Sequence, residues 1–191
     1  MNHTQLLNHL ASKHNLKSYL EIGINNPTNN FDKINCELKF GVDPEPTFNK
    51  YINVCTSDHY FEKINNGCKL DLIFIDGYHE VSQVKRDFDN SLRCLNDGGF
   101  IVIHDTLPDE EITTCVPRGD QKKWHGDVYR FVMTLKKYDG IDFITYNFDE
   151  GCTVVWKDRL HHPRKGIIEP NWENYIKHRK ELLNITEWQA I

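Results

Sequence analysis

Apolar and polar positions follow one another along the chain in a pattern that predicts strands separated by helices. Near-continuous apolar runs at residues 70–76 and 100–105 are typical of strands buried on both faces, as in a parallel sheet. Between them, residues 80–95 carry apolar side chains at helical spacing. Because a strand–helix–strand unit pairs its strands in parallel through a right-handed crossover, this stretch predicts a parallel sheet covered by helices.

The rest of the chain extends this pattern. Further helices are expected over residues 4–14 and 124–135, and further strands over 18–23, 37–43 and 51–58. Residues 141–148 and 152–158 are two more predicted strands, joined by a hairpin turn at Asp149-Glu150-Gly151. The predicted fold class is therefore α/β, a Rossmann-like, doubly wound, mostly parallel sheet with an antiparallel last strand and helices on both faces.

Length and composition fit one globular domain with a small appendage. The chain has 191 residues, of which 39% are hydrophobic and 12% aromatic, enough to build a core. We expect the main domain to span residues 1–160. Residues 161–191 are expected to form a linker and a last helix, packed on the same domain or on a partner subunit, as in a homodimer.

Charge and cysteine usage narrow the class of partner. The formal net charge of −5 argues against a nucleic-acid partner, because phosphate contacts need a basic surface. No apolar run approaches the roughly 20 residues of a membrane span, and the first residues lack signal-peptide features. Six cysteines form no CxxC pair, which favours reduced thiols. These features predict a cytoplasmic protein.

Polar residues stand where the predicted parallel strands end. They are Glu21 and Gly23 after the first strand, Asp43 after the second, Asp76 after the strand 70–76, and His104-Asp105 after the strand 100–105. Because the carboxyl ends of parallel strands meet at one edge of a sheet, where open α/β sheets bind ligands, we expect these side chains to share a crevice.

Asp43 follows the first glycine turn by about 20 residues, the spacing of an acid that accepts hydrogen bonds from a ribose diol. The alternative is an ordinary turn aspartate before Pro44. No second or third glycine follows Gly23 at the spacing that a pyrophosphate needs. The cofactor is therefore expected to carry a ribose and adenine, without a pyrophosphate at this turn.

The segments "YLEIGINN", "FGVDPEP", "VCTSDHYF", "DLIFIDGYHEVSQVKRDF", "LNDGGFIVIHDT" and "WHGDVYRFV" together resemble a class I S-adenosylmethionine-dependent methyltransferase over residues 15–158. The nearest subgroup is that of small-molecule and sugar O-methyltransferase-like domains with an FIDGxH motif. The resemblance implies a seven-stranded sheet with a reversed last strand. It also implies cofactor contacts from Glu21, Gly23, Asp43, Ser57, Asp58 and Asp76, with Ser57 and Asp58 at the adenine.

The resemblance also implies a reaction centre. Metal-dependent members similar to catechol methyltransferases place acids where Asp76, His104 and Asp105 stand, so these three would hold a divalent cation, Mg²⁺ or Mn²⁺. His104 departs from the usual carboxylate or amide and shifts the preference toward Mn²⁺, Fe²⁺ or Zn²⁺. His79 stands where the family keeps a general base. The alternative is that Asp76 and His79 only cap the following helix.

The expected activity is methyl transfer from S-adenosylmethionine to a hydroxyl of a sugar or another small molecule, with Asp76, His79 and His104 as catalytic residues. Two other classes stay open. One is a nicotinamide-dependent oxidoreductase on a similar sheet, against which the missing glycines count. The other is a noncatalytic interaction module that keeps the cofactor fold.

Overall fold

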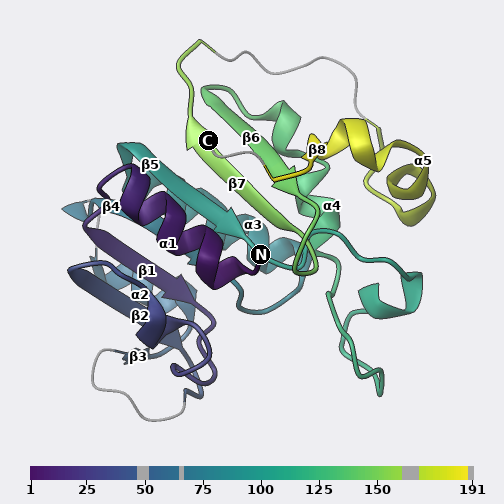
Figure 1. Cartoon of the computed structure of the whole chain (residues 1–191). Helices are drawn as coiled ribbons and strands as arrows, with labels where there is room; N and C mark the ends of the chain where they lie inside the picture. Colours follow the sequence, from purple (N-terminus) through teal and green to yellow (C-terminus); the bar gives the residue numbers. More distant parts are fainter. Residues whose placement is uncertain (47–51, 65–66, 161–167, 189–191) are drawn as a thin grey trace.

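One mixed sheet forms the centre of the computed structural model, which describes residues 1–46, 52–64, 67–160 and 168–188. The strands lie side by side in the order β3 (Ile52–Val54), β2 (Leu38–Asp43), β1 (Ser18–Ile22), β4 (Leu70–Ile75), β5 (Leu95–Ile103), β7 (Cys152–Lys157), β6 (Ile141–Tyr146) and β8 (Ile185–Thr186). The first five are parallel, and β7 is antiparallel to both β5 and β6 (Figure 1). The prediction of a mostly parallel sheet with an antiparallel last strand is confirmed.

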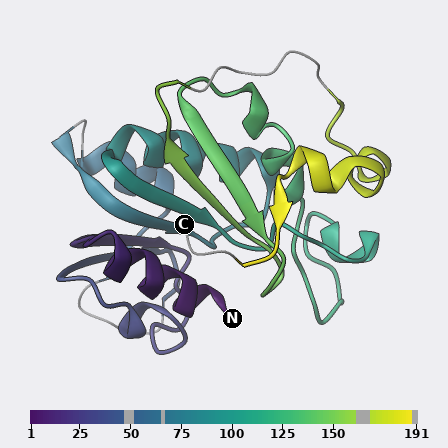
Figure 2. The same cartoon turned by 45° about the horizontal axis from the view of Figure 1, so that its top comes forward.

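Helices cover both faces of the sheet, as a doubly wound fold requires. On one face lies α1 (His3–Lys13), and on the other lie α2 (Ser57–Ile64), α3 (Val81–Cys94), α4 (Val128–Val132) and α5 (Trp172–Leu182) (Figure 2). Short 3₁₀ turns occupy η1 (Phe31–Lys33), η3 (Glu111–Thr114) and η4 (Leu135–Lys137). Each face therefore has its own apolar layer.

The apolar run of β4 is explained by these two layers. Leu72 and Phe74 enter the layer beneath α1, whereas Ile73 and Ile75 enter the layer beneath α3 and α4. Successive side chains of a strand point to opposite faces, so a strand covered on both sides needs apolar residues at every position. The same logic applies to the buried half of β5.

Local chemistry fixes the start of α1. The Asn2 side chain accepts a hydrogen bond from the backbone N–H of Gln5, and the Gln5 side chain accepts one from the backbone N–H of Asn2. This capping box satisfies two donors that the first turn would otherwise leave unpaired. Leu6, Leu7 and Leu10 then bury the apolar face of the helix on the sheet. The helix start is held in place beside the carboxyl edge of the sheet.

Three elements differ from the sequence prediction. The expected strand 51–58 is shorter in the structure, where β3 ends at Val54 and α2 begins at Ser57. Residue 51 lies outside the described residues. The expected helix 124–135 is the short α4 followed by η4. An eighth, two-residue strand, β8, pairs in parallel with β6 and widens the expected seven-stranded sheet. Across the described residues, every helix is too short or too polar to cross a membrane.

The C-terminal segment lies against the main domain where the structure describes it; residues 161–167 and 189–191 are outside the described residues. Tyr175 of α5 is fully buried, its ring lies 4.8 Å from that of Tyr129, and its hydroxyl donates to the carbonyl oxygen of Pro108 at 3.0 Å. Burying a tyrosine with its hydroxyl paired stabilises the contact. This contact joins α5 to α4 and to the loop after β5.

Candidate functional site

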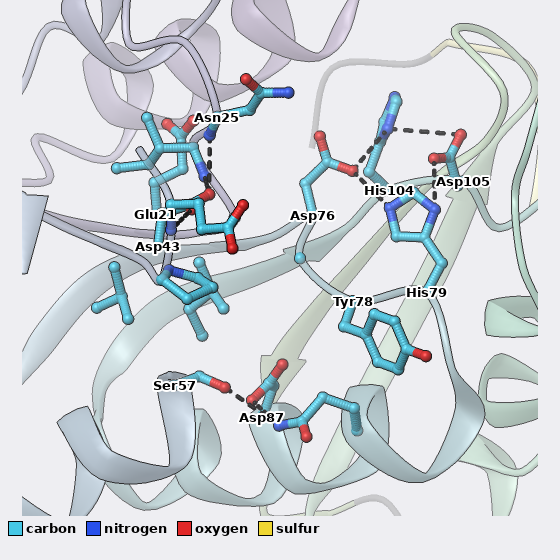
Figure 3. A pocket seen from close by; sticks show the side chains of 18 of the residues that line it. Glu21, Asn25, Asp43, Ser57, Asp76, Tyr78, His79, Asp87, His104 and Asp105 are labelled. Atoms are coloured by element: carbon cyan, nitrogen blue, oxygen red, sulfur yellow. Dashed lines mark hydrogen bonds and ion pairs between the residues drawn. The ribbon is translucent and has the colours of Figure 1, made fainter. Parts of the chain in front are cut away.

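A cavity of about 1030 Å³ opens at the carboxyl ends of β1, β2, β4 and β5 (Figure 3). Parallel pairing of these neighbouring strands brings their ends to one edge, as the sequence predicted. The predicted site residues that line it are Glu21, Gly23, Asp43, Ser57, Asp76, His79, His104 and Asp105. Asp58 does not line it and instead pairs with Arg86, with 3.3 Å between Oδ2 and Nε.

Gly23 allows two strand ends to approach closely. Its φ is +86°, and a Cβ there would lie 2.2 Å from the carbonyl oxygen of Asp76. Its own N–H donates to the carbonyl of Val42 at 2.9 Å. Only glycine tolerates both the left-handed backbone and the contact. The turn after β1 therefore packs directly against the first residue after β4.

Asp43 holds the loop that follows this turn. Its Oδ2 accepts from the backbone N–H groups of Ile24 and Asn25 at 2.9 and 2.8 Å, and its Oδ1 accepts from that of Glu45 at 2.8 Å. A carboxylate oxygen has room for about two hydrogen bonds, and from the described residues Oδ1 accepts only the one from Glu45. Asp43 thus shapes the loop and faces the cavity at the same time (Figure 3).

Glu21 is a buried acid in the floor of the cavity. Its Oε2 accepts from the Tyr19 hydroxyl at 2.5 Å and from the Asn30 amide at 2.9 Å. Burial, which disfavours the charged form, raises the pKa of the Glu21 carboxyl to about 8. At neutral pH this carboxyl therefore carries a proton in most molecules and can donate as well as accept.

Asp87 of α3 is a lining residue that the sequence reasoning missed. It is buried, and Gln83 Nε2 donates to its Oδ1 at 3.0 Å and to Ser57 Oγ at 3.1 Å. Burial raises the pKa of Asp87 to about 6. The signal was present, because Asp87 falls in the buried stripe of α3 between Val84 and Phe88, where an aspartate is out of place.

Two acids and two imidazoles meet on the other side of the cavity (Figure 3). His79 lies between the carboxylates, with Nε2 3.4 Å from Asp76 Oδ1 and Nδ1 3.4 Å from Asp105 Oδ2. His104 Nδ1 lies 3.3 Å from Asp76 Oδ1 and 3.6 Å from Asp105 Oδ1. The sequence prediction that Asp76 and His104-Asp105 end adjacent strands is confirmed by the pairing of β4 with β5.

The charges of this cluster stabilise one another. Burial would raise the pKa of Asp76, but His104 and His79 outweigh it and hold that pKa well below its ordinary range. Burial would lower the pKa of each histidine, but the surrounding carboxylates, with Asp76 the strongest among them, together outweigh it and raise both. Within the described residues, His79 Nδ1 and both ring nitrogens of His104 are buried without a hydrogen-bond partner. These nitrogens face carboxylate oxygens at 3.3 to 3.6 Å, outside hydrogen-bond geometry, which leaves capacity for a ligand between them.

The hypothesis that Asp76 and His79 cap the helix after them is wrong. The Val81 N–H at the start of α3 donates to Asp127 Oδ1 at 2.6 Å, and the N-cap residue Glu80 makes no side-chain cap. Asp127 also donates its own N–H to the His79 carbonyl at 3.1 Å. The Asp76 carboxylate and the His79 ring are thus free of a capping role.

His79 is held in place by the segment before α4. Its ring stacks on Trp124, with 5.0 Å between centroids, and its carbonyl oxygen lies against Gly126. A Cβ at Gly126, whose φ is +60°, would lie 1.9 Å from that oxygen. Gly126 and Trp124 therefore set the position of the His79 imidazole from a loop some distance along the chain.

The donor atoms fall into two groups that differ from the predicted metal triad of Asp76, His104 and Asp105. One group is Asp76, His79 and Asp105, and the other is His3, His104 and Asp149; in each, one donor atom per residue lies within 4.8 Å of the others. His3 begins α1, and Asp149 lies in the turn between β6 and β7. No strand-end pattern signals either residue, so the sequence reasoning missed both.

Comparisons with known proteins agree with this architecture. A family model described as a methyltransferase domain matches residues 32–106. Similar solved structures include an O-methyltransferase from Bacillus cereus in complex with SAH, 14% identical with a TM-score of 0.60, covering 81% of this chain and 80% of that one. None of the curated proteins matches the chain.

Two further solved structures are similar to this chain to about the same degree. The O-methyltransferase TomG from Streptomyces achromogenes, in complex with SAM, is 14% identical with a TM-score of 0.58, covering 81% of this chain and 79% of that one. The SAH-bound methyltransferase PaMTH1 from Podospora anserina is 15% identical with a TM-score of 0.59, covering 81% and 77%. At these identities the likeness shows that the chain shares the fold of these structures.

Proposed function

We propose that the protein transfers a methyl group from S-adenosylmethionine to a hydroxyl of a small molecule. The observation that carries this proposal is one cavity with two chemically distinct sides. One side has the glycine turn and Asp43, suited to a nucleoside. The other has the cluster of Asp76, His79, His104 and Asp105, suited to moving a proton from an oxygen. The methyltransferase-domain match over residues 32–106 supports the same conclusion.

The nucleoside side fits a cofactor with a ribose and adenine. Asp43 keeps an acceptor position toward the cavity for the ribose hydroxyls, although it also holds the loop backbone. Gly23 and Glu21 lie where the methionine portion would pass. For the adenine we propose Ser57 together with Asp87, since Asp58 is turned toward Arg86. An ionised Asp87 would accept a hydrogen bond from the exocyclic amine.

The reacting side fits proton removal. When bound, S-adenosylmethionine supplies an electrophilic methyl group, so the protein needs only to place the acceptor oxygen in line and to take its proton. His79 is proposed as the base, because its ring reaches both carboxylates and is fixed by Trp124. Asp76 orients the ring and stabilises the imidazolium that results.

A divalent cation fits between Asp76 and Asp105. Their oxygens, with an imidazole nitrogen close by, are the donors that Mg²⁺ or Mn²⁺ accept, and the unpartnered ring nitrogens leave donor capacity there. Such a cation would lower the pKa of a hydroxyl group coordinated to it. The predicted ligand His104 lies beside this set, with Nδ1 3.3 Å from Asp76 Oδ1.

The acceptor side favours a polar small molecule with a flat face. Trp124 and Tyr78 line the cavity beside His79, and the Arg118 guanidinium stacks over Trp124 at 5.6 Å. Aromatic and guanidinium planes stack on sugars and on phenolic rings alike. A sugar remains the proposed acceptor class, with phenolic diols as the second class to be tested.

Calorimetry tests the part of the proposal that concerns cofactor binding. S-adenosylmethionine and its demethylated product should bind at one site per chain, and NAD should not. Binding of NAD alone would favour the oxidoreductase alternative and overturn the proposal. A panel of sugars and phenolic diols with radiolabelled S-adenosylmethionine, with EDTA, Mg²⁺ or Mn²⁺, then tests transfer and its metal dependence. Cofactor binding without transfer to any acceptor would favour the noncatalytic module.

A further inference from the structure

We propose a second metal site, separate from the cation position proposed between Asp76 and Asp105, formed by His3, His104 and Asp149 and selective for a divalent transition metal such as Zn²⁺. The three residues come from the start of α1, the end of β5 and the β6–β7 turn. Figures 1 and 2 both show the N-terminus beside that turn. The site therefore joins three segments that are far apart in the sequence.

The donor atoms lie close to the spacing that a metal requires. His3 Nδ1 lies 2.6 Å from Asp149 Oδ2, and His104 Nε2 lies 3.6 Å from the same oxygen. Ligand atoms placed about 2.0 to 2.1 Å from a tetrahedral zinc ion are roughly 3.3 Å apart. Small side-chain rotations therefore suffice to bring the two nitrogens and one oxygen onto a common ion.

An unpartnered nitrogen points to a missing ligand. The His104 side chain is only 10% exposed, and within the described residues its Nε2 is buried without a hydrogen-bond partner. A separation of 3.6 Å from Asp149 is too long for a hydrogen bond. The position of Asp149 has an explanation without a metal, because its carboxylate accepts a hydrogen bond from the His3 backbone N–H at the start of α1. That hydrogen bond accounts for Asp149 but leaves His104 Nε2 unsatisfied.

The other nitrogen of His104 supports the assignment. A histidine that binds a metal through one ring nitrogen usually donates its other N–H to a carboxylate, which fixes the ring and strengthens the ligand. The Oδ1 atom of Asp76 lies 3.3 Å from His104 Nδ1, and a small rotation of the ring would align the N–H for that donation. The site would then hold His104 through Nε2 and orient Asp76 through Nδ1.

The donor set determines which ion is bound. Two imidazoles and one carboxylate suit Zn²⁺ and its first-row neighbours, whereas Mg²⁺ prefers oxygen ligands. His3 also packs against the site, since its ring stacks on Phe74 at 5.4 Å and meets His104 edge-on at 4.8 Å. The ion would thereby fasten the start of α1 over the cavity that His3 lines.

Zinc titration of the full chain, free of any histidine tag, tests this site. His79→Gln serves as the parent, because it removes the imidazole of the neighbouring group of donors. The parent should bind one Zn²⁺ by calorimetry, and Zn²⁺ but not Mg²⁺ should raise its melting temperature. Adding His3→Ala or Asp149→Asn should weaken Zn²⁺ binding by more than about 100-fold, beyond the loss seen when only an outer hydrogen-bond partner is removed.

A matched control and a second variant separate loss of the site from loss of an unrelated imidazole or of the fold. His14→Ala removes an exposed imidazole from the end of the same helix and should leave Zn²⁺ affinity within about twofold of the parent. Circular dichroism establishes folding, and His3→Asn replaces His3→Ala if that variant unfolds. Unchanged zinc affinity and stoichiometry in the His3 and Asp149 variants would overturn the site. The titration needs neither cofactor nor acceptor, so its failure is distinct from failure of the proposed function.

Discussion

The backbone of Gly23 lies so close to the carbonyl oxygen of Asp76 that a Cβ at position 23 would stand 2.2 Å from that oxygen. The two residues follow β1 and β4, which pair in parallel over four registered positions from Tyr19 to Ile22. This contact fixes the distance between the nucleoside side of the cavity and its acidic side. A change at Gly23 is therefore expected to act on both stability and cofactor binding.

Gly23→Ala should lower the free energy of unfolding by about 2 to 4 kcal/mol, because about 1 kcal/mol of backbone strain adds to the roughly 1 to 3 kcal/mol typical of an overpacked contact. Gly140→Ala is the matched control, because Gly140 has a φ of +71° but no atom within 4 Å of its Cβ position. That control should cost only the backbone strain, about 1 kcal/mol. Urea unfolding measures both. Equal losses for the two variants would show that the contact with Asp76 does not matter.

Asp43→Asn should weaken S-adenosylmethionine binding by about 10- to 100-fold, because hydrogen bonds to a charged acceptor are worth about 1.5 to 3 kcal/mol. Calorimetry gives the dissociation constant. The loop bonds to Ile24 and Asn25 can persist through the asparagine oxygen, but the amide NH2 then faces the Glu45 N–H and cannot accept it, so the free energy of unfolding should fall by about 1 kcal/mol. Wild-type affinity in a folded variant would contradict the ribose role and leave Asp43 as a turn residue.

Asp87→Asn and Asp58→Asn separate the two acids near the proposed adenine position. Asp87 lines the cavity, whereas Asp58 pairs with Arg86 outside it. Asp87→Asn should weaken S-adenosylmethionine binding by about tenfold, the effect of one charged hydrogen bond, and Asp58→Asn should leave it unchanged. The opposite ranking would restore the adenine contact that the sequence assigned to Asp58.

The arrangement of the strands was predictable because its causes are local. Apolar runs such as 70–76 can be satisfied only in a strand covered on both faces, and the order of strands and helices then leaves few topologies. The same rule places Asp43 and Asp76 at one edge. The strand-end residues of the cavity, from Glu21 to Asp105, thus followed from the strand order, whereas His79 was assigned from the family resemblance.

The contributions of His3 and Asp149 depend on tertiary packing and were not predicted, whereas that of Asp87 was missed although the buried stripe of α3 signals it. His3 lies in a helix start, and only the docking of α1 brings it within 2.6 Å of Asp149. The cap of α3 is a similar case, since Asp127 reaches Val81 from a different loop. Side chains that act across such distances leave no periodic signal in the sequence.

His79→Gln should reduce kcat by about 10²- to 10⁴-fold, the usual contribution of a positioned base. The dissociation constant of S-adenosylmethionine should change little, because His79 lies on the acidic side of the cavity. His59→Gln is the control, as His59 is about half exposed on α2 and should tolerate the change. Methyl transfer to the best acceptor of the panel provides the rate, and an unchanged kcat in His79→Gln would exclude it as the base.

Glu21 should make stability depend on pH. Its folded-state pKa is raised from 4.5 to about 8, chiefly by burial, so the folded protein retains a proton that the unfolded chain has lost. The stabilising contribution is complete below pH 4.5 and is lost as the pH rises through about 8. One such proton gives a slope of at most about 1.4 kcal/mol per pH unit. The free energy of unfolding should therefore fall across this window.

Glu21→Gln isolates this contribution, because glutamine resembles the protonated acid in shape and keeps an acceptor for the Tyr19 hydroxyl. Urea unfolding between pH 5 and 8, without cofactor, should show a shallower fall for the variant than for the wild type. Glu37→Gln, in an exposed pair with Lys17, should keep the wild-type slope. Since His79 and His104 also have raised pKa values and remain in both proteins, only the difference between the slopes reports Glu21. Parallel curves for wild type and Glu21→Gln would mean that the buried carboxyl is ionised across the whole range.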